Sequence, residues 1–267
     1  MKSLKGKIKG SRLEPFTRFI YQKIKNDKYD KYSSYSGSKK ILLACFPKSG
    51  STFTSSVIGK IDGFSKIPLV PLYGSREQEL DIRGLYKYRN INFVAQHHVR
   101  YSMYLEELLQ QYNVKPVILV RNIYDCIVSL ADHFRNESLI NPFAVINEEH
   151  IKFTDEQLYR VIADLVMPWY INFYVGWKMS SIEPLIVRYE DMIDNPENYF
   201  KKIFDVVDVN ITSKEIAECI GKVQSEKTLL NKGIKDRGRS LPPEVKKHVK
   251  RLASHYPSVD FSDIGIS

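Results

Sequence analysis

Cysteine is scarce in this sequence of 267 residues, and the few cysteines follow no pattern. Cys45, Cys126 and Cys219 are odd in number, lie far apart, and show neither CxxC nor Cys/His spacing. This arrangement argues against a disulfide framework and against a zinc site, and the sequence points to no other metal ligands. It predicts a reducing, cytoplasmic location.

Long hydrophobic runs are also missing. The longest apolar stretches, ILLACF and PVILV, are far shorter than the roughly 18 residues that a membrane-spanning helix needs. The charged N-terminal segment, MKSLKGKIKGSRLEPF, is not followed by the apolar core of a signal peptide. We therefore expect neither a transmembrane segment nor a secretory signal.

An excess of one charge is absent from most of the chain. Residues 1–40 contain 12 Lys or Arg and 3 acidic residues, whereas the rest balances 28 basic against 28 acidic side chains. A balanced domain does not indicate a nucleic-acid partner. The basic segment is predicted to be a solvated leader or a weak contact to an anionic surface. Because residues 11–27 have amphipathic spacing, we expect a basic helical arm over 1–38 and a single domain over 39–267.

Strand-like and helical segments alternate along the remainder. Short apolar runs at 39–46, 91–96, 116–120 and 184–189 are typical of strands, the strongest of them buried on both faces. Segments with helical spacing separate them, and neither a repeat nor a change in composition marks a second domain. The pattern predicts a three-layer α/β domain around a mostly parallel central sheet.

The most specific segment is ILLACFPKSGSTFTSSVI, residues 41–58. A buried strand runs into a tight turn containing Gly50, and a helix begins directly after it, so backbone N–H groups point into one small volume. The turn also gathers an ammonium group and three hydroxyls: Lys48, Ser49, Ser51 and Thr52. These residues predict a phosphate-binding strand–loop–helix, with a purely structural turn as the alternative.

The order of residues in this loop bears on the function. Nucleoside triphosphatases use GxxxxGK[ST], in which the lysine follows the second glycine. Here Lys48 stands two residues before Gly50, which argues against an ATPase or kinase. A nucleotide kinase that uses the same loop on ATP, with magnesium, remains an alternative function. A non-catalytic anion-binding module is another.

Two motifs resemble the sulfotransferase family, whose sulfuryl donor is 3′-phosphoadenosine 5′-phosphosulfate (PAPS). PKSGST resembles the family's 5′-phosphosulfate loop, commonly PKSGTTW, and RNIYDCIVS resembles its 3′-phosphate motif, RNPKDVAVS. The resemblance implies that Arg121 and Ser129 bind the 3′-phosphate. Independently of it, Arg121 ends a buried strand, at the edge where open parallel sheets bind ligands. The implied ligands of the 5′ end are Lys48, Ser49, Gly50, Ser51, Thr52 and Phe53, with Phe53 stacking on adenine where Trp is usual.

Two further segments resemble the family less closely. In IVRYEDM, Tyr189 takes the position of a tyrosine near adenine, and Ser225 is a further candidate adenine contact. NKGIKDRG resembles the RKGxxGDW element that closes over the 3′-phosphate, so Lys232 and Gly233 are implied cofactor ligands. Asp236-Arg237 replaces the family's Gly-Asp pair, which makes Arg237 or Arg239 the candidate replacement.

The family's catalytic base is a histidine in a KTH segment after a strand. Here the segment reads QHH, with Gln96 in the position of the lysine, and the resemblance implies that His98 is the base, with His97 second. His133, in the helix after Arg121, is predicted to be structural. Transfer of a sulfuryl group also needs positive charge on the departing phosphate, which we assign to Lys48.

Together these features predict a cytosolic-type, PAPS-dependent sulfotransferase. The acceptor is expected to be a small molecule with a hydroxyl or an amine, and the released product is adenosine 3′,5′-bisphosphate (PAP). Residues 62–90 and 136–153 are predicted to line the acceptor pocket, but they carry no pattern that identifies the acceptor.

Overall fold

The computed structural model describes residues 37–70, 79–141, 143–226 and 234–267. The predicted basic arm over 1–38 and its helix lie almost entirely outside these residues, so the division at residue 38 stays a prediction. The strands are β1 (Lys40–Cys45), β2 (Phe64–Lys66), β3 (Asn92–His97), β4 (Lys115–Val120) and β5 (Leu185–Arg188). The α-helices are α3 (Ser51–Ile58), α4 (Ile82–Lys87), α5 (Met103–Gln111), α6 (Ile123–Asn136), α7 (Asp155–Leu165), α8 (Met167–Lys178), α9 (Tyr189–Asp194), α10 (Pro196–Asp205), α11 (Ser213–Ser225) and α12 (Pro243–Ala253). Short 3-10 turns are η1 (His150–Lys152), η2 (Arg237–Ser240) and η3 (Ser262–Ile264).

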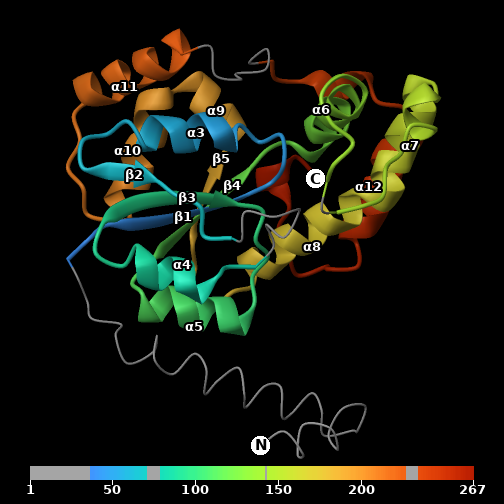
Figure 1. Ribbon diagram of the computed structural model, residues 1–267. Coiled ribbons are helices and arrows are strands. Elements are labelled where there is room, and N and C mark those ends of the chain that lie inside the picture. The colour runs from blue at the N-terminus through green and yellow to red at the C-terminus, as the bar shows by residue number, and fades with distance from the viewer. Residues whose placement is uncertain (1–36, 71–78, 142, 227–233) are drawn as a thin grey trace, which may run out of the picture.

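A parallel five-stranded sheet in the order β2-β3-β1-β4-β5 forms the middle layer (Figure 1). The strand order reverses around β1, which pairs with β3 on one side and β4 on the other. Ligands bind open parallel sheets at the carboxyl ends of the strands, beside such a reversal. The prediction of an α/β domain with a mostly parallel sheet is confirmed.

Helices cover both faces of the sheet and give it two hydrophobic cores. Along β1, Ile41 and Leu43 belong to the core under α3, α10 and α11, whereas Leu42 and Ala44 belong to the core under α4 to α8. Alternate side chains of a strand point to opposite faces, so a strand buried twice must be apolar at every position. This explains the uninterrupted apolar run that marked β1 in the sequence.

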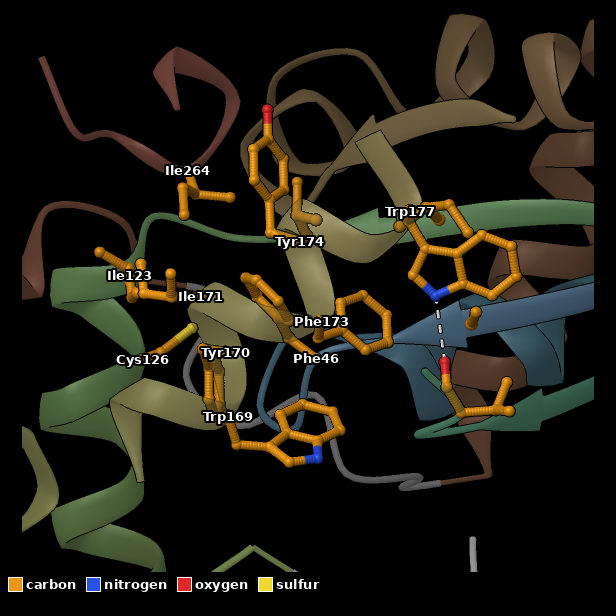
Figure 2. Close-up of a cluster of buried hydrophobic side chains, with 14 of the residues drawn as sticks. Phe46, Ile123, Cys126, Trp169, Tyr170, Ile171, Phe173, Tyr174, Trp177 and Ile264 are labelled. Carbon is orange, nitrogen blue, oxygen red and sulfur yellow. Dashed lines mark hydrogen bonds between the residues drawn. The ribbon is translucent and has the colours of Figure 1, made fainter. Parts of the chain in front are cut away.

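The larger core anchors the turn that follows β1. Phe46 packs against the rings of Tyr170 and Phe173 from α8, with ring centroids 4.6 and 5.2 Å apart (Figure 2). The Tyr170 hydroxyl donates to the carbonyl of Pro47 at 3.0 Å. Trp177, on the same helix, donates from its indole N–H to the Val99 carbonyl at 3.1 Å. Helix α8 therefore fixes the chain just beyond the ends of β1 and β3.

Two helices begin at capping boxes, and two elements were not foreseen from the sequence. Thr154 and Thr212 form the capping boxes that begin α7 and α11. Strand β2 and helix α4 lie within residues 62–90, which the sequence did not assign to regular structure. Within the described residues, no helix has the length and apolar character needed to cross a membrane.

Candidate active site

The carboxyl ends of four strands converge on one cavity of about 370 Å³. Lys48 follows β1, His98 follows β3, Arg121 follows β4 and Tyr189 follows β5. The lining residues are Pro47, Lys48, Gly50, Ser51, Thr52, Phe53, Gln96, His98, Arg121, Ser129, Leu130, His133, Phe134, Glu137, Ile140, Asn141, Phe143, Tyr189 and Met192. Segments far apart in the sequence thus meet at the edge where a ligand is expected.

The turn between β1 and α3 presents backbone donors to this cavity. Lys48 and Gly50 adopt the left-handed conformation, with φ of 62° and 81°. Gly50 is the N-cap of α3, and the first helical bond runs from the Thr54 N–H to the Gly50 carbonyl at 3.0 Å. The N–H groups of residues 51–53 precede that bond, so they lie in the open first turn, where a helix binds anions.

The two serines of the turn are used differently from what the hydroxyl pattern predicted. The Ser49 side chain is buried and donates to the Phe46 carbonyl at 2.6 Å, so its hydroxyl stabilises the turn and does not line the cavity. The Ser51 hydroxyl accepts from the side-chain amide of Gln96 at 3.1 Å. Gln96 also accepts from Ser55 at 3.3 Å. This amide therefore connects the end of β3 to α3.

Arg121 ties three segments together beneath the cavity. Its guanidinium donates to the Lys48 carbonyl at 3.0 Å and to the Ile234 carbonyl at 2.9 Å, and it lies 3.5 Å from the Asp125 carboxylate. The group also stacks on the Tyr189 ring at 4.2 Å. Arg121 is 5% exposed, and its Nε is buried with no hydrogen-bond partner among the described residues. A charged donor left in this way is expensive unless a ligand satisfies it.

A second cavity of about 190 Å³ adjoins the first beside Arg121. Arg121, Ser129 and Glu137 line both cavities. Arg237 reaches the second one from η2 and bonds Asp132 of α6 at 2.5 Å. Of the two arginines proposed to compensate for the altered C-terminal motif, Arg237 is the one that lines a cavity.

His97 and His98 are neighbours in sequence but have different surroundings. His97 is 4% exposed, and its Nε2 accepts the Leu69 N–H at 2.9 Å. Burial, with a smaller contribution from the charge of His98, lowers the pKa of His97 to about 4. His98 lines the cavity instead, with Nδ1 2.8 Å from the Cys45 carbonyl and its ring 5.8 Å from that of Phe143.

The hydrogen bond at Nδ1 sets the chemistry of His98. The Cys45 carbonyl can only accept, so in the neutral ring Nδ1 carries the proton. Nε2 is then the basic nitrogen, and it is the atom able to take a proton from a bound molecule. Of the two histidines, His98 has the position and the tautomer that a base requires.

His133 differs from its sequence-based interpretation. It was assigned a structural role, but its side chain lines the cavity on the same wall as Ser129. Its Nδ1 lies 2.7 Å from the Glu137 carboxylate and 3.5 Å from the Lys48 ammonium. Glu137 was not singled out from the sequence. Its spacing of eight from Ser129, two helical turns along α6, is the signal that could have found it.

Besides Ser49, three predicted ligands are not placed at the site by the described structure. Ser225 is exposed at the end of α11, does not line the cavity, and its hydroxyl donates to the Lys222 carbonyl at 2.8 Å. Lys232 and Gly233 lie outside the described residues. Of the two predicted acceptor segments, 136–153 contributes Glu137, Ile140, Asn141 and Phe143 to the cavity lining, whereas the described parts of 62–90 contribute no lining residue.

No cluster of three or more His, Cys, Asp or Glu side chains among the described residues is arranged to hold a metal ion. The charged and aromatic side chains that line the cavity are those of Lys48, Arg121, Glu137, His98, His133, Phe53, Phe134, Phe143 and Tyr189.

Comparison with known proteins relates this geometry to other structures. The mouse sulfotransferase SULT7A1 in complex with PAP is 18% identical, with a TM-score of 0.61 over 85% of this chain and 86% of that chain. A retinol dehydratase in complex with androsterone and PAP is 16% identical, with a TM-score of 0.56 over 85% of this chain and 84% of that one. The sulfotransferase STF9 from Mycobacterium avium is 12% identical, with a TM-score of 0.53 over 90% and 81%. These structures share the fold.

The family follows from the sequence itself. A family model described as "Sulfotransferase domain" matches residues 38–236, which include the loop after β1, His98, Arg121, Ser129 and Tyr189. This match covers most of the chain. The protein therefore belongs to the sulfotransferase domain family.

Proposed function

We propose that this protein transfers a sulfuryl group from PAPS to a hydroxyl or amine of a small-molecule acceptor and releases PAP. The observation that carries the proposal is the convergence of two anion-binding elements on adjoining cavities. The first is the open turn of α3 with Lys48, and the second is Arg121 with Ser129. A nucleotide that is phosphorylated at both its 5′ and 3′ positions suits this arrangement. PAP itself is bound in the mouse and retinol dehydratase structures that share the fold.

The residues present fit such a ligand. The N–H groups of residues 51–53 and the Lys48 ammonium would hold the 5′ end. Arg121 and Ser129, which line both cavities, would hold the 3′-phosphate, with Arg237 also lining the second cavity. Phe53 and Tyr189 line the cavity between these ends and supply the rings for adenine.

PAPS supplies an activated sulfuryl group whose leaving group is the 5′-phosphate of PAP. His98 accepts the acceptor proton at Nε2 while the acceptor oxygen or nitrogen forms its bond to sulfur. The bond between sulfur and the bridging oxygen breaks, and its electron pair remains on the phosphate. Lys48 and the first-turn N–H groups of α3 stabilise the charge that develops there. Most of the rate enhancement then comes from positioning and charge stabilisation.

Three further proposals concern the acceptor, the location and the arm. The acceptor end of the cavity contains Phe143, Ile140, Phe134 and Leu130, which supports a small acceptor with an apolar body. The retinol dehydratase structure contains such a molecule, androsterone.

The three buried free cysteines support a reducing, cytoplasmic location. We keep the division into a basic arm, 1–38, and one domain, 39–267, as a proposal.

The identity of the cofactor is tested by differential stabilisation. PAP should raise the melting temperature in proportion to its binding free energy, and ATP should do so much less, because the second anion site is built for a 3′-phosphate. The measurement is a thermal shift over a titration of each nucleotide, with and without magnesium. Equal shifts, or hydrolysis of ATP that depends on magnesium, would contradict the proposal and favour a kinase-like function.

The role of His98 is tested by His98→Ala, with His97→Gln as the matched control. We expect His98→Ala to lower single-turnover transfer by about 10²–10⁴-fold, the range for loss of a general base, with PAP affinity nearly unchanged. His97→Gln keeps an acceptor for the Leu69 N–H and should leave turnover within a few-fold. Transfer that survives His98→Ala and disappears in His97→Gln would reverse the assignment.

A further inference from the structure

A polar stripe on α6 is not explained by the proposed function. Ser129, His133 and Glu137 follow one another at intervals of four residues, so they share one side of the helix and its C-cap. All three line the main cavity. Ser129 faces the proposed phosphate site, but His133 and Glu137 have no part in binding or transfer as described so far.

Glu137 contacts two other groups that line the cavity. Its Oε2 lies 3.4 Å from the Lys48 ammonium and 2.7 Å from His133 Nδ1. The Lys48 side chain is 16% exposed and that of Glu137 39%, so this ion pair is screened less than one on an open surface. The carboxylate and the ammonium both line the cavity in which an anion is proposed to bind.

The contact between Glu137 and Lys48 bears on nucleotide binding because the nucleotide is also an anion. PAPS and PAP carry several negative charges, and Lys48 is the cation assigned to their 5′ end. A carboxylate beside that ammonium competes with an incoming phosphate for its N–H donors. Both anions can approach the lysine at once only at an electrostatic cost. Binding of the nucleotide should therefore replace Glu137 on Lys48.

We propose that Glu137 is a positioning residue that holds Lys48 and His133 in the nucleotide-free protein and gives up Lys48, but not His133, when the nucleotide binds. The inference rests on the proposed function, since Lys48 needs a nucleotide phosphate as its second partner. The bond to His133 connects residues one turn apart on α6 and does not depend on the ligand. Glu137 thereby weakens nucleotide binding by the free energy of the contact that is lost.

A purely structural role gives a different expectation. Pairs at i and i+4 stabilise a helix by about 0.2–0.5 kcal/mol, and Glu137 is the C-cap of α6. If the carboxylate served only the helix, its removal would lower the melting temperature slightly and leave PAP affinity unchanged. The exchange predicts tighter PAP binding, and only where Lys48 is present.

The experiment is a double-mutant cycle that measures PAP affinity by calorimetry. In the natural background, Glu137→Gln should tighten PAP binding about 2- to 5-fold, the upper part of the range for release of a partly exposed ion pair. In a Lys48→Met background the same substitution should change affinity less than twofold. Glu156→Gln is the matched control, because Glu156 forms an exposed i,i+4 pair with Arg160 on α7 and does not line either cavity.

Three outcomes would overturn the inference. PAP binding could be unchanged or weaker in Glu137→Gln, or it could tighten equally in the Lys48→Met background, which would indicate a general charge effect. Tightening in Glu156→Gln would indicate the same. If Glu137→Gln does not fold, Glu137→Ser removes the same charge and takes its place. Failure of every variant, the natural protein included, to bind PAP would instead contradict the proposed function.

Discussion

Two strand–turn–helix units lie side by side at the ligand-binding edge, and they are built in opposite ways. In the unit formed by β1 and α3, the N-cap is Gly50, which has no side chain, so the first turn of α3 opens toward the cavity. In the unit formed by β4 and α6, the N-cap is Asn122, whose side-chain Oδ1 accepts from the N–H groups of Tyr124 and Asp125 at 3.0 and 3.4 Å. The first helix end is left for a ligand, and the second is satisfied by the protein.

The difference shows how each unit would recognise an anion. The β1–α3 turn offers backbone N–H groups, which need a particular backbone conformation more than particular side chains. The β4–α6 turn offers side chains, Arg121 before the helix and Ser129 two turns along it. The two units also touch, since Arg121 donates to the Lys48 carbonyl. Adjacent strands can thus bind the two ends of one nucleotide by different means.

Gly50→Ala tests the backbone-based unit and should have the largest effect. The φ of 81° is unfavourable for alanine, and a Cβ at this position would stand 2.8 Å from Cδ2 of Tyr189 and 3.0 Å from Cε of Met192. The turn must shift, so several charge-assisted bonds weaken together, and we expect PAP affinity to fall about 10²–10³-fold. Calorimetry with PAP gives the measurement.

Gly221→Ala is the control for this substitution. A Cβ at Gly221 would meet nothing within 4 Å, and the residue lies inside α11, where alanine is the better helix former. Stability should stay equal or rise slightly, and PAP affinity should not change. If Gly50→Ala also binds PAP normally, the first turn of α3 does not recognise the nucleotide through its backbone.

The sequence was sufficient for the parts of the fold that depend on continuous burial. β1 and β4 were placed to within one residue because a strand buried on both faces of a parallel sheet is apolar along its length. β3 and β5 were placed as closely from shorter apolar runs, although β5 is a half-buried edge strand in which Val187 is the buried residue. β2 was missed for a related reason. It is a three-residue edge strand, Phe64–Lys66, in which only Phe64 is buried, so it carries too little pattern to detect.

Some residues of the candidate site could also be predicted from the sequence, and others could not. Lys48 and Arg121 could be placed at the cavity from the sequence because each follows a strand within a short motif, and a local motif is visible in a sequence. Glu137 was missed because its contact with Lys48 joins residues 89 positions apart, through the way α6 packs beside the turn. Ser49 was taken as a ligand because a hydroxyl looks the same in a sequence whether it faces a cavity or, as here, its own backbone. Side-chain direction and long-range pairing are set by packing, which composition and spacing do not encode.

Arg121→Ala tests the unit that uses side chains. A hydrogen bond to a charged group contributes roughly 1.5–3 kcal/mol, so PAP affinity should fall about 10- to 150-fold. The substitution also removes two bonds to backbone carbonyls and leaves Asp125 buried beside an empty space, so we expect a lower melting temperature as well. The informative quantity is therefore the ratio of PAP affinity to adenosine 5′-monophosphate affinity. The loss should be large for PAP and small for adenosine 5′-monophosphate, which lacks the 3′-phosphate, and equal losses would contradict the assignment.

Asn122→Ala, the matched control in the same turn, should have the smallest effect on the ligand. Asn122 caps α6 but does not line either cavity. Loss of an N-cap typically costs about 1 kcal/mol of stability, and the Asn122 side chain also lies where a Cβ on Gly265 would stand, so it fills space against the C-terminal segment. Chemical denaturation should show that loss, while the ratio of PAP to adenosine 5′-monophosphate affinity stays that of the natural protein. Arg121→Ala and Asn122→Ala both destabilise the start of α6. Ligand recognition is therefore shown only if the ratio of PAP to adenosine 5′-monophosphate affinity changes in Arg121→Ala and stays the same in Asn122→Ala.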